Sequence, residues 1–451
     1  MKPSDSKPKT TPRREFLRNS VIAGAAVAAA GPFVHTGRAA AVEKIRIGLV
    51  GCGGRGTGAA LNALLMPTRV IYPPPGNGYH TENAVPGAKP RAENVEIVAL
   101  ADLFQHRLDQ CRRQLRIAGV EVPDNRCFTG FDSYEKVLEL PEVNYVLFAS
   151  PPQFRPREFR AAVEAGKHVF LEKPIAVDAP GVRSVLETGK LAEKKGLTVG
   201  AGTVRRHRLD QQETVKRLRD GAVGEILEAQ AWFNVGEIWA IPRVDSWSDL
   251  EWQHRNWPYF TWLAGDIIVE QHIHMLDIVN WVLGTHPIRA YGTGGRISHP
   301  PGGTFGHTYD HFFIEYEYPG GVRMYSMNRQ IAGCDNRVAN RVKGTKGESN
   351  CQDTILANGK QWKYQGKMTD PYEQEQMDFI AAIRSGNPIN ETQAVAEATL
   401  TAILGRESAY SGRVLEWDTV LNSKRSYTPA KYEFGPAEMP EVVNPKHYEF
   451  Y

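Results

Sequence analysis

Three ionisable side chains fall at spacings of four and three residues within one apolar segment: Glu270, His274 and Asp277. Residues at these spacings share one face of an α-helix, and segment 267–279 is otherwise apolar enough to be a buried helix. Burying three ionisable groups together is costly unless they pair or take part in chemistry. The alternative is a core histidine satisfied by two acids. Two candidate ligands without a clear third do not make a metal site, so we expect no metal.

A lysine lies where a ligand could reach it. Glu172-Lys173-Pro174 follows the apolar run 168–171, and Ser150-Pro151-Pro152 ends the run 145–149. Ligands bind at the carboxyl ends of the strands in an open parallel sheet, so both triplets are expected at that edge. A lysine there can donate a hydrogen bond to a substrate hydroxyl, and a desolvated one can titrate near neutrality. Taken alone, Lys173 would be interpreted as a surface charge.

A glycine-rich turn indicates a nucleotide site. It follows the strand-like run 45–50, opens a helical stretch and reads Gly51-Cys52-Gly53-Gly54-Arg55-Gly56. Such glycines allow a tight turn and close approach to a pyrophosphate, and the helix N-terminus attracts its negative charge. Asp102, at the end of run 95–100, can accept hydrogen bonds from ribose hydroxyls and would repel a 2′-phosphate. We therefore expect NAD rather than NADP; the alternative for Asp102 is a solvated strand end.

Aromatic residues gather just before the apolar segment: Trp252, Trp257, Tyr259, Phe260 and Trp262. Aromatic faces stack on the apolar faces of sugar rings, and polar neighbours can bind hydroxyl groups. The cluster favours a sugar-like substrate, although some of its members must simply pack in the core.

The elements that would position these residues form two domains. Strand-like runs alternate with helical stretches up to about residue 200, which predicts a doubly wound parallel sheet with the Rossmann topology. Longer strand-like runs follow at 225–235, 288–297, 310–318 and 321–330, with helices near 372–384 and 393–410. They predict a second α/β domain with an open, mainly antiparallel sheet.

The domain boundaries follow from this pattern. We expect a nucleotide-binding domain at 42–175 and a second domain at 176–422, the first part of which completes the Rossmann sheet. Segment 66–94 has no periodicity and is read as a loop insertion on the side opposite the cofactor crevice. Asp102 lies 51 positions after Gly51 rather than the usual ~20, and this insertion accounts for the excess. Residues 423–451 are expected to pack as an extended arm on this or a neighbouring subunit.

Residues 1–41 are typical of a twin-arginine export signal. Arg13 and Arg14 precede Phe16-Leu17, a mild apolar run and the small residues Ala39-Ala40-Ala41. The sequence predicts export of a folded protein to the periplasm, without stable membrane insertion after cleavage. An uncleaved anchor is the alternative.

Composition excludes several classes of protein. The chain carries 54 basic and 51 acidic side chains; residues 1–41 hold seven of the basic and two of the acidic ones, which leaves 47 against 49. The basic excess thus belongs to the signal, and no nucleic-acid partner is expected. The five cysteines are scattered and form neither a disulfide framework nor a zinc pattern, although a pair such as Cys334 with Cys351 remains open.

Taken together, these motifs resemble the Gfo/Idh/MocA oxidoreductase family. The resemblance rests on Gly51–Gly56, Asp102, the two strand-end triplets, Gly221-x-x-Gly224-Glu225-Ile226, Glu270-x-x-x-His274-x-x-Asp277 and Gly344-Thr345-Lys346-Gly347. It implies a Rossmann domain followed by an α/β domain whose open sheet often forms oligomers, so we expect a homo-oligomer through that sheet.

The resemblance also implies catalytic roles. The family lysine falls on Lys173 and the family histidine on His274. We expect His274, with an ordinary pKa of ~6.5, to take the hydroxyl proton while hydride leaves for the nicotinamide. Lys173 would hold the alcohol oxygen and Glu270 would orient the imidazole, although the family usually has Asp at that position.

Further contacts are expected around these groups. The segment Thr203-Val204-Arg205-Arg206-His207 lacks the glutamine often found there in the family. Arg205 remains a candidate cofactor ligand beside the glycine loop, Glu172 and Ser150–Pro152. The substrate candidates are Trp257, Asp277, His207 and His311.

Two reactions fit these residues. The first is oxidation of a sugar or polyol by tightly held NAD. The second is cleavage of a glycoside by transient oxidation, which acidifies the neighbouring C–H so that the glycosidic bond leaves by elimination. A binding protein without turnover is disfavoured because Lys173 and His274 are both present. Because no NAD pool is expected outside the cytoplasm, an exported enzyme should hold its nucleotide almost irreversibly and run a redox-neutral cycle.

Overall fold

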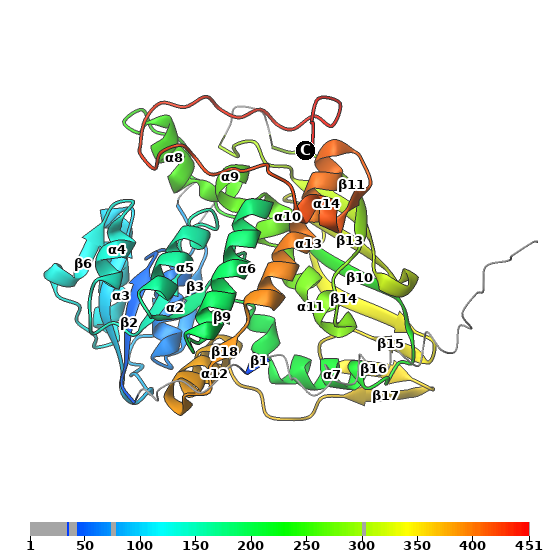
Figure 1. Cartoon of the computed structure of the whole chain (residues 1–451), viewed down its shortest axis with the longest axis horizontal. Helices are drawn as coiled ribbons and strands as arrows, with labels where there is room; N and C mark the ends of the chain where they lie inside the picture. The colour runs from blue at the N-terminus through cyan, green and yellow to red at the C-terminus, as the bar shows by residue number, and fades with distance from the viewer. Residues whose placement is uncertain (1–33, 36–42, 74–77, 300–303, 451) are drawn as a thin grey trace, which may run out of the picture.

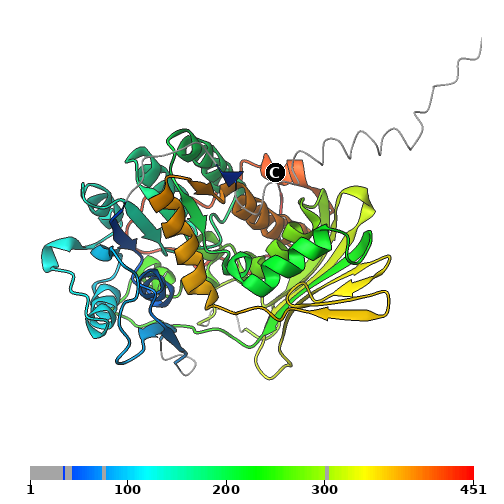
Figure 2. The ribbon, with the colours of Figure 1, turned by 90° about the horizontal axis from the view of Figure 1, so that it is seen from below.

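Two sheets form the framework of the protein, in a computed structural model that describes residues 34–35, 43–73, 78–299 and 304–450. The first sheet and its helices lie at the left of Figure 1 and the larger second sheet at the right. Figure 2 shows the two halves side by side, with helices packed between them. The predicted signal segment lies outside the described residues, except for Val34–His35.

The first sheet is a doubly wound Rossmann sheet in the order β1-β18-β9-β8-β7-β2-β5-β6. Its strands are β1 (Val34–His35), β2 (Ile45–Val50), β5 (Val95–Asp102), β6 (Cys127–Thr129), β7 (Tyr145–Phe148), β8 (His168–Leu171), β9 (Val199–Ala201) and β18 (Ile389–Asn390). Seven strands are parallel, and β1 pairs antiparallel with β18 at one edge. The parallel-sheet prediction is confirmed, but the contribution of β18 from far along the chain was not foreseen.

Helices cover both faces of this sheet, which is why its central strands are apolar throughout. They are α2 (Gly54–Ala63), α3 (Gln105–Ile117), α4 (Ser133–Leu138), α5 (Arg155–Glu164), α6 (Ala179–Lys194) and α12 (Pro371–Ser385). Because β2 pairs with both β5 and β7, the strand order reverses beside β2. A crevice at such a switch point is where this fold binds nucleotides.

The second sheet has the order β17-β16-β15-β14-β10-β13-β12-β11-β19. Its strands are β10 (Ile226–Val235), β11 (Arg289–Gly295), β12 (His311–Glu317), β13 (Arg323–Gln330), β14 (Arg337–Gly344), β15 (Gly347–Ser349), β16 (Thr354–Ala357), β17 (Lys360–Lys363) and β19 (Leu415–Glu416). All neighbours are antiparallel except β10 and β13. The mainly antiparallel sheet is as predicted, although β14 to β17 were not foreseen.

One face of the second sheet is covered and the other is open. Along β12, Phe312, Ile314 and Tyr316 are buried beneath helices, whereas Phe313 is 40% exposed on the opposite face. The covering helices include α11 (Ile273–Leu283) and α13 (Thr392–Ser411). Shorter helices at the domain junction are α8 (Asp249–Arg255), α9 (Thr261–Ala264), α10 (Ile267–Glu270) and α14 (Trp417–Leu421).

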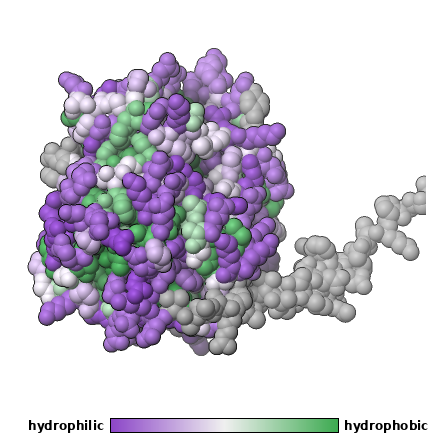
Figure 3. All heavy atoms as spheres, turned by 60° about the vertical axis from the view of Figure 1, so that its left-hand side comes forward, coloured by the Kyte–Doolittle hydropathy of each residue, from purple (hydrophilic) through white to green (hydrophobic). Residues whose placement is uncertain are grey.

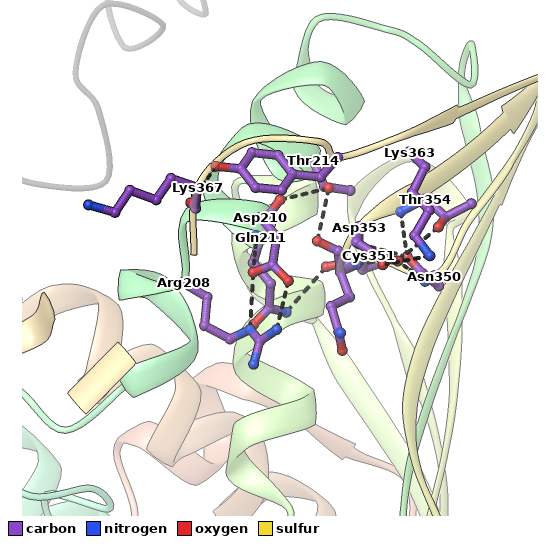
Figure 4. Close-up of polar contacts among 12 residues, drawn as sticks. Arg208, Asp210, Gln211, Thr214, Asn350, Cys351, Asp353, Thr354, Lys363 and Lys367 are labelled. Carbon is purple, nitrogen blue, oxygen red and sulfur yellow. Dashed lines mark hydrogen bonds and ion pairs between the residues drawn. The ribbon is translucent and has the colours of Figure 1, made fainter. Parts of the chain in front are cut away.

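Helix α7 (Leu209–Arg219) connects the two domains and is anchored at its start (Figure 4). Gln211 Nε2 donates to the carbonyl oxygen of Cys351 at 3.3 Å, and Thr214 Oγ1 donates to that of Gln352 at 2.9 Å. These bonds attach α7 to the turn between β15 and β16. The thiols of Cys351 and Cys334 are free, so the disulfide left open by the sequence is not formed.

Segment 66–94 folds as a hairpin of β3 (Thr68–Ile71) and β4 (Thr81–Ala84). Residues 423–450 run as an extended arm, drawn in red across α8 and α9 in Figure 1. Figure 3 shows hydrophilic and hydrophobic atoms interspersed over the Rossmann side of the surface. Within the described part of the chain, no helix has the length and apolarity to cross a membrane.

Candidate active site

The glycine-rich loop lies at the edge of an open cleft of about 860 Å³. Gly51 has φ +95°, and a Cβ there would meet the backbone of Ala149 at 2.5 Å. A Cβ at Gly56 would meet Gly51 O at 1.7 Å, whereas one at Gly53 would have no neighbour within 4 Å. The turn therefore requires glycine at Gly51 and Gly56, and Gly53 leaves room for a ligand. This is the cradle that a pyrophosphate fits at the N-terminus of α2.

Asp102 lines the same cleft and also braces the loop. Its Oδ2 accepts a hydrogen bond from Cys52 N at 2.6 Å, and its Oδ1 accepts one from Phe104 N at 2.8 Å. Burial raises the pKa of Asp102, although Arg107 and the two backbone bonds oppose the shift. The carboxylate can still face a ribose with its remaining lone pairs. The bracing role was not foreseen from the sequence.

Arg55 lines the cleft between two carboxylates. Its guanidinium lies 2.8 Å from Glu82 Oε2 and 3.2 Å from Glu172 Oε1. Burial raises the pKa of Glu82 to about 7, even though Arg55 favours the charged form. With Glu172 next to Lys173, the arginine connects the hairpin and the glycine loop to the strand end that carries Lys173. Arg55 was predicted to contact the cofactor. Its ion pairs give it a positioning role as well.

Lys173 sits at a break in the expected helix. Segment 267–279 forms two helices, α10 and α11, with Gln271 and His272 between them. Lys173 Nζ donates to the carbonyl oxygen of Glu270 at 2.6 Å and to its Oε1 at 3.0 Å. In a continuous helix that carbonyl would accept from the residue four positions later, His274. The lysine takes this acceptor, so the single-helix prediction is wrong here.

Glu270 is therefore the partner of Lys173. The hydrogen bonds of its carboxylate, within the described part of the chain, go to Lys173 and Gln271. The prediction that Glu270 orients His274 is corrected accordingly: the carboxylate holds the lysine in place instead.

His274 keeps the protonation state that a base needs. Burial lowers its pKa well below the ordinary value, and the positive charges of Lys173 and Arg205 lower it further. A lowered pKa favours the neutral imidazole, which is the form that can accept a proton. The charge of Arg205 thus helps to lower the pKa of His274. Its predicted role as a cofactor ligand stays a prediction.

Three residues that were predicted to contact the substrate do not line the cleft. Asp277 is 2% exposed and makes a bidentate ion pair with Arg206 at 2.8–3.1 Å. His207 is fully buried, 2.7 Å from Asp378 Oδ2. His311 shares the open face of the second sheet with Phe313, because alternate residues of β12 face opposite sides. All three predictions are corrected, since the groups serve packing, ion pairing or the outer surface.

The aromatic cluster divides between core and cleft. Tyr259 and Phe260 are fully buried and Trp252 is 3% exposed, so these three pack in the core. Trp257 lines the cleft, and its predicted contact with substrate stays a prediction. Trp239 also lines it, 6.2 Å from Trp257 in an edge-to-face arrangement. It was missed because it stands alone in the sequence, outside the cluster.

The 66–94 hairpin reaches the cleft, contrary to the prediction that it lies on the opposite side. Tyr79 and His80 line the cleft beside the glycine loop. The hairpin runs back along α2 towards the N-terminus of that helix, with β4 packed against it. A Cβ at Gly54 would meet His80 O at 2.3 Å, and one at Gly58 would meet Glu82 Oε2 at 1.7 Å. Two glycines one helical turn apart make this packing possible, a signal that the sequence did contain.

The ionisation of His80 is affected by burial and by the charges of Glu270, Arg55 and Lys173. Burial lowers its pKa, Glu270 raises it, and Arg55 and Lys173 lower it further. Lys173, Glu270 and His274 are not themselves among the residues that line the cleft, whereas His80 is. Within the described ranges, no group of three or more metal-ligating side chains occurs.

Comparison with known proteins identifies the family. The model described as "Oxidoreductase family, NAD-binding Rossmann fold" matches residues 45–203, and the "GFO/IDH/MocA C-terminal domain" model matches residues 212–349. The chain belongs to the Gfo/Idh/MocA oxidoreductase family. Its first domain is therefore the NAD-binding domain of this family, and the cradle at Gly53 fits that cofactor.

Relatives within the Gfo/Idh/MocA family differ in their named reactions. The scyllo-inositol 2-dehydrogenase (NAD(+)) of Bacillus subtilis is 25% identical over 78% of this chain and 94% of its own length. A glycosyl hydrolase family 109 protein of Shewanella pealeana is 22% identical over 52% of this chain and 48% of its own length.

A solved structure confirms the fold. The aldose-aldose oxidoreductase of Caulobacter crescentus superposes with a TM-score of 0.61 at 17% identity, covering 83% of this chain and all of its own.

Proposed function

We propose that this chain is an exported enzyme that oxidises a ring hydroxyl of a sugar or polyol with tightly held NAD. The observation that carries the proposal is the Lys173–Glu270 pair at the break between two helices, together with the positive charge of Lys173, which helps to lower the pKa of His274. Bound NAD would supply the hydride acceptor, and the glycine loop, Asp102 and Ser150–Pro152 would hold it.

The protein groups perform the proton chemistry. Lys173 donates a hydrogen bond to the alcohol oxygen and stabilises the negative charge that develops on it. Neutral His274 removes the hydroxyl proton as hydride departs. Glu270 keeps Lys173 in position through the 3.0 Å ion pair. Trp257 offers a face for the sugar ring.

The proposed location is the periplasm, because residues 11–18 carry the twin-arginine pattern. Outside the cytoplasm the cycle should be redox-neutral, with each substrate oxidation matched by a reduction. The open face of the second sheet, with Tyr291 58% and Phe313 and Met327 each 40% exposed, supports a homo-oligomer built through that sheet.

The test begins with exported protein screened against sugars and polyols for a spectral change of its bound nucleotide. His274→Ala should lower kcat by about 10²–10⁴-fold, the usual worth of a general base, and Lys173→Ala should also abolish most turnover. Lys190→Ala, an exposed lysine of α6, is the matched control and should turn over normally. Full activity in both site variants would refute the assignment.

A second candidate reaction is glycoside cleavage by transient oxidation, which the similarity to the glycosyl hydrolase family 109 protein favours. The products separate the two reactions. Accumulation of a ketosugar with reduced nucleotide supports oxidation. Release of an aglycone, with solvent deuterium in the sugar and no net change of the nucleotide, supports cleavage.

A further inference from the structure

The nucleotide cleft has a wall that the Rossmann fold does not provide. Its floor comes from the glycine loop and the strand ends. Facing the loop are Tyr79 and His80 from the hairpin, and Trp239 and Trp257 from the second domain. All four line the same cleft, although they lie far apart in the sequence.

The hairpin half of this wall is firmly seated. The packing of its backbone and Glu82 against Gly54 and Gly58 leaves no room for a side chain at either glycine. Glu82 adds the ion pair with Arg55 at 2.8 Å. Tyr79 is further held by the guanidinium of Arg107, 4.8 Å from its ring centroid.

The two halves meet across the cleft. The rings of Tyr79 and Trp239 are 6.1 Å apart in an edge-to-face arrangement, and those of His80 and Trp239 are 6.5 Å apart. Trp239 then contacts Trp257. A continuous row of rings therefore joins the Rossmann domain to the second domain beside the glycine loop.

A second contact between the domains lies at Phe104, another residue that lines the cleft. The guanidinium of Arg255, in the second domain, lies 4.1 Å from the ring centroid of Phe104, which lines the cleft. Phe434 of the C-terminal arm stacks on Phe104 at 5.7 Å. A nucleotide in the cleft would thus be enclosed by both domains.

We propose that Tyr79 and Trp239, joined edge to face across the cleft, are nucleotide-binding residues that hold NAD against exchange. The inference deepens the proposed function, since it explains how an exported enzyme keeps its cofactor. The Tyr79–Trp239 contact slows the departure of the nucleotide, so the rate of release reports on that contact.

The experiment measures release of radiolabelled NAD⁺ from the purified full chain into an excess of unlabelled NAD⁺. Tyr79→Ala and Trp239→Ala should each release nucleotide at least tenfold faster than the wild type. Because the two rings act as one contact, the double variant should be little faster than either single variant. Val70→Ala, a 45% exposed residue of the same hairpin, should release at the wild-type rate.

Two further variants keep the result interpretable. Tyr79→Phe retains the ring and should release slowly, which separates loss of the contact from loss of folding. Lys173→Ala should also release slowly while losing turnover, so retention and chemistry can fail independently. Unchanged release in both alanine variants, or rapid release by the wild type, would overturn the proposal even if sugar oxidation is found.

Discussion

Lys173 donates a hydrogen bond to the carbonyl oxygen of Glu270. In a continuous helix through α10 and α11, that oxygen would accept from a backbone N–H instead. The side chain thereby does two things at once: it ends α10 and is itself held rigidly by the residue it interrupts. Rigid placement of a charged donor is what stabilisation of a developing oxyanion needs, because the group need not reorganise during the reaction.

The neutral state of His274 predicts a pH profile. A general base is active when unprotonated, and the pKa of His274 lies below the ordinary value. The kcat/KM should therefore stay level from pH 7 to below pH 6 and fall only at more acidic pH. Arg205→Gln removes one of the positive charges that lower this pKa, so its acidic limb should move to higher pH.

The control is Arg217→Gln, a change of the same charge on the exposed side of α7, where Arg217 pairs with Glu213. Its profile should match the wild type. An acidic limb that is unchanged in Arg205→Gln would show that Arg205 does not act on the base.

At the scale of elements, α12 is held to the segment after β9 by a buried charge. His207, in the 3₁₀ turn Val204–His207, lies 2.7 Å from Asp378 and 3.5 Å from Glu391. Burial opposes the charge on His207, but hydrogen bonds to these two carboxylates raise its pKa to about 10.

Replacing this histidine should therefore destabilise the fold in a pH-dependent way. His207→Gln removes the cation that pairs with Asp378 and with the buried Glu391, and should cost about 3 kcal/mol in unfolding free energy. Because the folded-state pKa is raised, the stabilisation is fully present below the ordinary value of ~6.5 and is lost as pH rises through about 10. Denaturant unfolding should show the largest difference from wild type near pH 6 and a smaller one near pH 10. An equal difference at both values would contradict a charged His207.

The sequence predicted local elements well, but it predicted contacts between residues far apart in the chain poorly. The strand before the glycine loop follows from the apolar run 45–50, and β12 and β13 follow from the strand-like runs 310–318 and 321–330. The break after α10 was hidden because the apolar pattern runs on, and the group that bonds to the carbonyl there is a lysine 97 positions earlier. The hairpin was predicted on the opposite side from its place after the crossover helix, and the packing that Gly54 and Gly58 allow was not considered.

At the scale of the whole molecule, the C-terminal arm connects parts of both domains. Tyr432 packs against Phe154 at 5.4 Å, and its hydroxyl accepts a hydrogen bond from Gln153 Nε2 at 3.0 Å. Near the end of the arm, the hydroxyl of Tyr448 donates to the buried carboxylate of Glu407. The arm therefore lies on its own subunit, one of the two arrangements expected from the sequence.

Removing the arm should loosen the molecule as a whole. A chain ending at residue 422 should unfold at a lower temperature by calorimetry, because Phe154 and Phe104 lose apolar contacts and Glu407 loses a buried hydrogen-bond donor. Met439→Ala, which alters a 37% exposed side chain of the arm, should leave the unfolding temperature nearly unchanged. A truncated chain as stable as the full one would mean that the arm does not hold the domains.

The edge strand β18 has a consequence for how the protein is made. Residues 389–390 and the preceding helix α12 complete the Rossmann half, yet they are among the last quarter of the chain to be synthesised. Domains generally fold in order as they leave the ribosome, but this first domain cannot be finished until nearly the whole polypeptide has emerged. Its final assembly is therefore a late, post-synthetic event, and a nascent chain stalled before α12 should remain sensitive to protease in its N-terminal half.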